Sequence, residues 1–209
     1  MSRNSHAGFS LIEMLVVLGI LAILAGASLG GYSFMTRRAE QARGRELVAN
    51  AATALNVLFQ KQGRWPKALL AEGSGGDGRL TALAGMCFVQ NKLMDLSSDD
   101  VQLTGLDRCG IVTPWATAVL KRLPRGDTGL SAKVPSGGTV EDHQLHFALD
   151  LDGDGIVEAN LGSRTVKVRA NAVVWCWGMN GKEDDYEASM TGRGKADDIY
   201  SWSRKQEDR

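Results

Sequence analysis

A long run of uncharged, mostly apolar residues opens the chain. No residue in the run 14–36 carries a charge. An α-helix rises about 1.5 Å per residue, so this run predicts a helix that can cross the roughly 30 Å hydrocarbon core of a membrane. In residues 37–62 apolar positions recur every three or four residues, which predicts that the helix continues with one apolar face. Gly63 and Pro66 are predicted to end it.

After this helix the pattern changes to that of short strands. Apolar residues alternate with polar ones in two segments and form continuous runs in others, which predicts strands at 143–149, 164–169, 172–177 and 199–202. Residues 80–93 predict a short helix, the glycine-rich segment 73–78 a loop, and the charged end 203–209 a frayed tail. The order predicts an α+β protein in which one long N-terminal helix packs on a C-terminal antiparallel sheet.

Composition narrows the classes of function. The 209 residues suffice for one domain beside a long helix. Basic and acidic residues number 24 each, so no nucleic-acid partner is expected. The sequence also contains no recognisable nucleophile motif and no phosphate-binding glycine loop, so we predict that the chain is not an enzyme.

Glu13 is an acidic residue at the start of the apolar run. A carboxylate inside a membrane helix costs about 2.5–3.5 kcal/mol, so Glu13 is expected to have a partner. If the chain is cut after Gly8, the new amine of Phe9 lies one helical turn from Glu13. Either the chain's own amine or that of a staggered neighbouring copy then neutralises the carboxylate.

The segment Gly-Phe-Ser-Leu-Ile-Glu-Met-Leu-Val-Val, at 8–17, resembles the prepilin signature of type IV pilins and type II secretion pseudopilins. In that family a prepilin peptidase cuts after the glycine and methylates the new N-terminus. The resemblance implies cleavage between Gly8 and Phe9, N-methylation of Phe9, and Glu13 as the residue that orders assembly. It also implies a pilin-like division of the chain into a leader (1–8), a transmembrane and assembly helix (9–36), an amphipathic continuation (37–62) and a globular head (63–209).

Two other interpretations of the N-terminus stay open. A secretory signal would be cleaved after its apolar run, where residues 25–27 (Ala-Gly-Ala) offer small side chains. An uncleaved single-span anchor would explain the hydropathy and leave Glu13 unexplained.

The segment Gly-Arg-Trp-Pro, at 63–66, is similar to the Gly-x-Tyr-Pro turn of major pseudopilins. The resemblance implies a pseudopilin of a type II secretion system that polymerises into a periplasmic pseudopilus. Its implied partners are copies of itself, other pseudopilins, inner-membrane assembly proteins, prepilin peptidase and the membrane. Two alternatives remain: a type IV pilin for adhesion, motility or DNA uptake, and a membrane-tethered enzyme or calcium-binding domain that never polymerises.

The same resemblance places the leader in the cytoplasm and the head in the periplasm, with one pass through the inner membrane. The charges flanking the apolar run favour the opposite orientation by a small margin, since Arg3 precedes the run and Arg37 and Arg38 follow it. We give the resemblance precedence.

Acidic residues at alternate positions predict a calcium site in the middle of the head. Asp150, Asp152 and Asp154, followed by Gly155, match the first half of an EF-hand loop. The twelfth position is Leu161, so the bidentate glutamate of that loop is missing. The alternative is a polar turn between strands, which Asp-Gly pairs commonly form.

A second calcium site is implied by resemblance alone. Residues 177–182 and 197–202 are similar to the C-terminal loop of major pseudopilins, which surrounds a structural calcium ion. Carried over, Asp197 and Asp198 become side-chain ligands. The alternative is a solvated acidic loop with no ion.

The chain has three cysteines. In an oxidising periplasm one pair is able to bridge, and Cys87–Cys109 is the predicted pair, although the sequence does not fix the connectivity. Cys176 lies in an apolar run and is predicted to be a buried small residue. His143 and His146 face opposite sides of a predicted strand, so we expect hydrogen-bonded or surface histidines and no shared metal.

Overall fold

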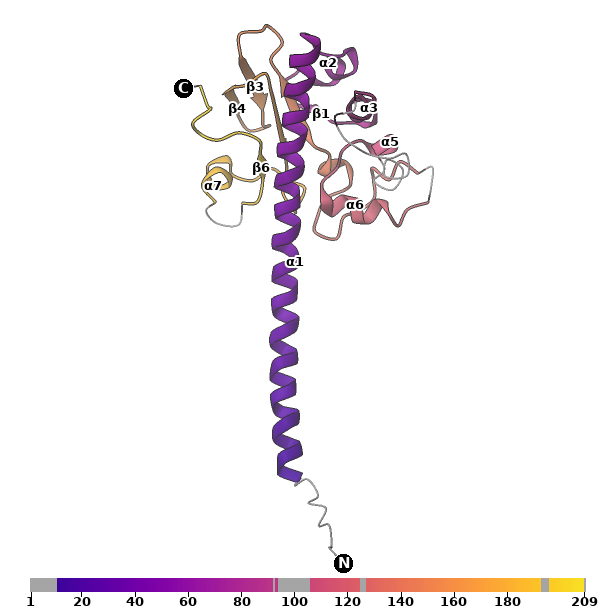
Figure 1. Cartoon of the computed structure of the whole chain (residues 1–209), viewed down its shortest axis with the longest axis vertical. Helices are drawn as coiled ribbons and strands as arrows, with labels where there is room; N and C mark the ends of the chain where they lie inside the picture. Colours follow the sequence, from indigo (N-terminus) through magenta and orange to yellow (C-terminus); the bar gives the residue numbers. More distant parts are fainter. Residues whose placement is uncertain (1–10, 92, 94–105, 125–126, 193–195, 209) are drawn as a thin grey trace, which may run out of the picture. The chain divides into compact units, whose positions relative to one another are not determined.

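The computed structural model describes residues 11–91, 93, 106–124, 127–192 and 196–208 (Figure 1). The chain divides into two compact units, Met1–Ala39 and Glu40–Arg209. The predicted cleavage residues Gly8 and Phe9 lie outside the described residues. Helix α1 (Leu11–Gln62) begins in the first unit and ends in the second.

In the first unit, α1 presents large apolar side chains to its surroundings. From Leu11, which is 82% exposed, to Leu24, which is 57% exposed, the large apolar side chains are at least half exposed. A Cβ built on Gly19 or Gly26 would meet, within 4 Å, no described atom beyond its own helical backbone and chain neighbours. Over the described residues, no helix combines the length and the apolar character needed to cross a membrane.

The end of α1 confirms the predicted stop. The helix ends at Gln62, and Gly63 takes a left-handed φ of 64° while its amide donates to the Phe59 carbonyl at 2.7 Å. The Trp65 ring stacks on Phe59 with centroids 4.7 Å apart, and its Nε1 donates to the Asp150 carbonyl at 2.7 Å. This aromatic ring therefore ties the helix end to the turn that follows a later strand.

Antiparallel strands form two sheets in the second unit. The first has four strands in the order β1 (Gly78–Arg79), β2 (His146–Leu149), β5 (Ala172–Cys176) and β6 (Ile199–Tyr200). The second pairs β3 (Ile156–Asn160) with β4 (Thr165–Arg169). The long helix and the antiparallel sheets confirm the predicted α+β, pilin-like class, and β5 is the interior strand that its apolar run predicted.

Short helices complete the second unit. They are α2 (Lys67–Gly73), α3 (Ala82–Gln90), α5 (Leu106–Cys109), α6 (Pro114–Leu120), the 3₁₀ turn η1 (Glu141–His143) and α7 (Tyr186–Thr191). The helix predicted at 80–93 is confirmed as α3. The loop predicted at 73–78 is shorter than expected, because Gly73 ends α2 and Gly78 begins β1.

Two apolar clusters cover the two faces of the four-stranded sheet. The first joins the second half of α1, through residues such as Leu55 and Leu58, to Phe147 and Val174. The second joins the same sheet, through Val173 and other residues, to the β3–β4 ribbon. Alternate residues of β5 point to opposite faces of the sheet, and a core covers each face, so β5 is buried at every position. β4 is buried only at alternate positions.

The cysteines differ from the prediction. Cys87 on α3, Cys109 at the end of α5 and Cys176 on β5 are all buried thiols outside any disulfide. Burial raises the pKa of Cys87, and it raises the pKa of Cys109 to about 11. The structure therefore does not contain the predicted Cys87–Cys109 bridge, while Cys176 is the buried small residue that its surroundings predicted.

The frayed tail predicted at 203–209 is also wrong for the residues that the structure describes. Residues 203–208, which we name the C-terminal strap, run beside β4. The Arg169 amide donates to the Gln206 carbonyl and the Asp208 amide to the Lys167 carbonyl, each at 2.8 Å. Arg169 also forms an ion pair with Asp208 at 2.8 Å. The strap is ordered because its backbone pairs with the outer edge of β4. The charged side chains of the strap give no sign of this pairing in the sequence.

Candidate cation site

Three carboxylates meet in the connection between β5 and β6. Asp184, Asp197 and Asp198 each place one carboxylate oxygen within 4.8 Å of the others, and we name them the carboxylate cluster. Asp197 and Asp198 directly precede β6, whereas Asp184 lies on the other arm of the connection, just before α7. The resemblance to major pseudopilins implied Asp197 and Asp198, and the structure places Asp184 beside them.

Backbone amides hold these carboxylates in place. Asp198 accepts the Gly178 amide on Oδ1 at 2.9 Å and the Asp184 amide on Oδ2 at 2.8 Å. Asp197 accepts the Met179 amide on Oδ2 at 2.8 Å and donates its own amide to Asp184 Oδ2 at 2.9 Å. Each aspartate therefore bonds to a residue from the other arm, which fixes the cluster in place.

One oxygen in the cluster accepts no hydrogen bond from the residues that the structure describes. Asp197 Oδ1 is buried and accepts from no described donor. Burial raises the pKa of Asp197, and the neighbouring Asp184 carboxylate adds to the effect. Burial likewise raises the pKa of Asp198 to about 6, with Asp184 and Asp197 contributing. Half-buried and buried carboxylates that repel one another, with one oxygen lacking a described donor, form a set of ligands that a hard cation neutralises.

Gly178 allows this close approach. A Cβ built there would lie 1.9 Å from Asp197 Oδ1, far below any van der Waals contact. We expect Gly178→Ala to displace the Asp197 carboxylate and to lower the free energy of unfolding by about 1–3 kcal/mol, the usual cost of overpacking. Thermal unfolding measures this loss.

Gly75→Ala is the matched control for that substitution, since a Cβ on Gly75 would meet nothing within 4 Å. It should leave the unfolding midpoint within a degree or two of the wild-type value. Equal midpoints for Gly178→Ala and Gly75→Ala would show that the contact with Asp197 is unimportant.

The raised pKa of Asp198 predicts a pH dependence in the absence of metal. The pKa of aspartate is near 3.9 in an unfolded chain, and burial raises the pKa of Asp198 to about 6 in the fold. The folded state therefore binds the proton more tightly, so this contribution to stability is complete below about pH 4 and is lost as the pH rises through about 6. We expect the metal-free protein to gain on the order of 1–2 kcal/mol from this residue between pH 7 and pH 4.5.

This effect has to be measured as a difference between two proteins, because His143 contributes a pH dependence of the opposite sign. Burial lowers the pKa of His143, so its contribution to stability is lost as the pH falls. Thermal midpoints of the wild type and of Asp198→Asn, recorded in chelator from pH 7 to pH 4.5, isolate the contribution of Asp198. Parallel curves for the two proteins would contradict the prediction.

The turn at 150–155, here the acidic turn, uses its carboxylates differently. Their oxygens also lie within 4.8 Å of one another, as the sequence predicted for Asp150, Asp152 and Asp154. Asp150 is buried and accepts the amides of Gly153 at 2.7 Å and Gly155 at 2.9 Å. The exposed Asp154 accepts the Ile156 amide at 2.7 Å. These bonds are those of a polar turn, which connects strands of two different sheets.

The remaining predicted residues are not members of the carboxylate cluster. Glu13 is in the first turn of α1, and its side chain is exposed. His143 is buried between the Thr113 hydroxyl at 3.2 Å and the Gly137 carbonyl at 2.9 Å. His146 is buried and contacts Asp77 Oδ1 through Nδ1 at 2.6 Å. The prediction that both histidines are hydrogen-bonded is confirmed by these described contacts.

Comparison with known proteins relates the N-terminal part of the chain to pilins. Residues 3–29 match the family model of the prokaryotic N-terminal methylation motif. Type IV major pilin protein PilE1 of Neisseria gonorrhoeae is 33% identical over 60 residues, which are 29% of this chain and 36% of the pilin. PilE of the same organism is 35% identical over 60 residues, again 29% and 36% of the two chains. Fimbrial protein EcpC of Eikenella corrodens is 29% identical over 73 residues, or 35% and 48%.

The matched region thus spans about a third to a half of the length of these curated relatives. No solved structure matches the chain. The chain therefore carries a type IV prepilin-like N-terminal methylation motif, and it is similar to type IV pilins over that part.

Proposed function

We propose that this chain is a structural fibre subunit, a pseudopilin of a type II protein secretion system that polymerises into a periplasmic pseudopilus. The match to the N-terminal methylation motif carries the proposal that it polymerises. Under this proposal, prepilin peptidase cleaves after Gly8 and methylates Phe9. Glu13 then pairs with the Phe9 amine of an adjacent copy. The chain has no catalytic role.

The first unit supports assembly through side-by-side helices. From Leu11 to Leu24 its described large apolar side chains are at least half exposed, and a Cβ on Gly19 or Gly26 would meet nothing described beyond its own helix within 4 Å. Small residues let membrane helices approach closely, so copies of α1 gain contacts from each other that a single chain lacks. Before assembly the same surface anchors the subunit in the inner membrane with its head in the periplasm, where other pseudopilins and assembly proteins engage it.

The carboxylate cluster favours secretion over a pilus. Its buried Asp197 Oδ1 lacks a described donor, and its three oxygens suit calcium, which takes carboxylate and carbonyl ligands. We propose that Asp184, Asp197 and Asp198 hold a structural calcium ion that stabilises the connection between β5 and β6. The cysteines all precede this connection, so none is available to close a C-terminal disulfide loop within it.

A type IV pilin for adhesion, motility or DNA uptake is the second candidate. The similarity of the N-terminal part to pilins of Neisseria and Eikenella favours it. The two candidates share the processed N-terminus and the fibre, and they differ in what the fibre does.

Deletion of the gene in its own host, scored by the proteins in the culture medium, tests the choice. Loss of specific folded exoproteins, restored by the wild-type gene and by Glu46→Ala but not by Glu13→Ala, is the result expected of a pseudopilin. Glu46 is a suitable control because it is an exposed glutamate of α1 outside the apolar run. An unchanged medium with lost surface fibres, adhesion or DNA uptake would assign the chain to the pilins. If neither changes, the chain is a tethered domain that does not polymerise.

A further inference from the structure

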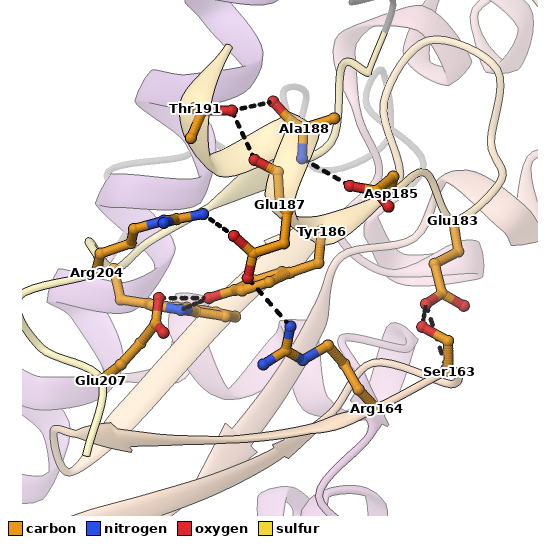
Figure 2. Close-up of polar contacts among 11 residues, drawn as sticks. Ser163, Arg164, Glu183, Asp185, Tyr186, Glu187, Ala188, Thr191, Arg204 and Glu207 are labelled. Carbon is orange, nitrogen blue, oxygen red and sulfur yellow. Dashed lines mark hydrogen bonds and ion pairs between the residues drawn. The ribbon is translucent and has the colours of Figure 1, made fainter. Parts of the chain in front are cut away.

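Helix α7 is held to the body of the second unit by side chains from two directions (Figure 2). The Glu187 carboxylate forms an ion pair at 3.3 Å with Arg164, which lies just before β4. It forms a second ion pair with Arg204 of the C-terminal strap. The Tyr186 hydroxyl donates to Glu207 of the strap at 2.9 Å and accepts from Trp202 Nε1 at 3.0 Å. The strap therefore contacts α7 through both Arg204 and Glu207.

These contacts are needed because α7 has little to stabilise it alone. The helix has six residues, and Tyr186 is its one buried residue. So short a helix is unstable in isolation, and its position depends on tertiary contacts. The ion pairs are well exposed, with Glu187 58% and Arg204 42% accessible in their side chains, so each is worth little by itself. The strap and α7 consequently hold each other through several weak contacts.

The carboxylate cluster is connected to α7 along two short routes. Asp185, whose carboxylate caps α7 by accepting the Ala188 amide at 2.7 Å, is adjacent in sequence to Asp184. The Tyr186 ring also meets the Tyr200 ring edge-on at 5.1 Å, and the Tyr200 hydroxyl donates to Asp198 Oδ2 at 3.3 Å. A shift of α7 therefore moves groups that position both Asp184 and Asp198.

We propose that the C-terminal strap is a positioning element for the cation site: its docking against β4 and α7 orders Asp184 and Asp198, so that calcium binding and strap docking stabilise each other. This inference rests on the calcium site proposed above. Coupling of this kind is reciprocal, so whatever the strap adds to calcium affinity, calcium adds to strap docking.

The test uses the full chain in detergent and measures both directions of the coupling. Deletion of residues 204–209 is expected to weaken calcium binding, measured by titration calorimetry, about tenfold. Tyr186→Phe, which keeps the ring and removes the hydroxyl bonds, is expected to weaken it severalfold, and near-ultraviolet circular dichroism checks that both variants are folded. In the wild type, calcium should slow amide exchange at Gln206 and Asp208.

Arg122→Ala is the matched control, since Arg122 is an exposed arginine that follows α6. It should leave calcium affinity and exchange in the strap unchanged. The coupling would be overturned if neither the deletion nor Tyr186→Phe changed the calcium affinity and if calcium did not change amide exchange in the strap. The cation site itself would be unaffected by that result. Absence of calcium binding to the wild type would remove the site and the coupling together.

Discussion

A chain carrying Glu13→Ala is expected to insert into the membrane normally and to form no fibres. The substitution removes a carboxylate that costs about 2.5–3.5 kcal/mol within a membrane helix, so insertion does not suffer. The same change removes the partner that we propose for the Phe9 amine of the neighbouring copy, and with it the interaction that sets the stagger between helices. Membrane fractionation measures insertion, and electron microscopy of sheared fibres measures assembly.

Glu13→Gln keeps the size of the side chain and removes its charge, so it should behave like Glu13→Ala if pairing is electrostatic. Glu46→Ala should assemble as the wild type does. Normal fibres from Glu13→Ala would refute the assembly role, and normal fibres from Glu13→Gln alone would show that shape matters and charge does not.

Removal of calcium is expected to lower the thermal midpoint of the wild-type protein by about 5–10 °C. Calcium at a hundred times its dissociation constant adds about 2.7 kcal/mol to a folded state that alone binds it, and 1 kcal/mol moves the midpoint of a domain of this size by about 2–4 °C. Differential scanning calorimetry in calcium and in chelator measures the shift.

Asp197→Asn should raise the thermal midpoint in chelator and remove most of the stabilisation by calcium. An amide in place of the Asp197 carboxylate keeps an acceptor for the Met179 amide, removes one of the repelling charges and offers a donor toward Asp184. We expect the variant to melt above the wild type in chelator, and to gain little when calcium is added.

Asp152→Asn is the control for that substitution, because Asp152 is an exposed member of the acidic turn. It should keep the full calcium response. A wild-type midpoint that chelation does not change would contradict the calcium site, and a response lost in Asp152→Asn but kept in Asp197→Asn would move the site to the acidic turn.

Local signals predicted the parts of the fold that depend on neighbouring residues. Gly63 ends α1 because glycine adopts the left-handed conformation with little steric cost. Val166 and Val168 face inward because successive side chains of a strand point to opposite faces. The sequence places strands on both sides of the acidic turn and gives no bounds for β3, since its inward residues Val157 and Ala159 are small and β3 begins directly after that turn.

Features that depend on distant parts of the chain could not be predicted in this way. Asp184 joins Asp197 and Asp198 only through amide bonds made between the two arms of one connection, 13 and 14 residues apart in sequence. The strap is ordered by the free edge of β4, which its own composition does not indicate. Whether Cys87 and Cys109 bridge likewise depends on geometry between separate helices.

The burial of β5 on both faces also limits how this protein can diverge. Every residue of the strand contacts one of the two cores, whereas alternate residues of β4 face away from them. Sequence drift is therefore expected to be slowest in residues 172–176 and faster at the outward positions of β4. An antibody raised against the intact protein is able to reach the outward residues of β4, whereas the buried residues of β5 are closed to it.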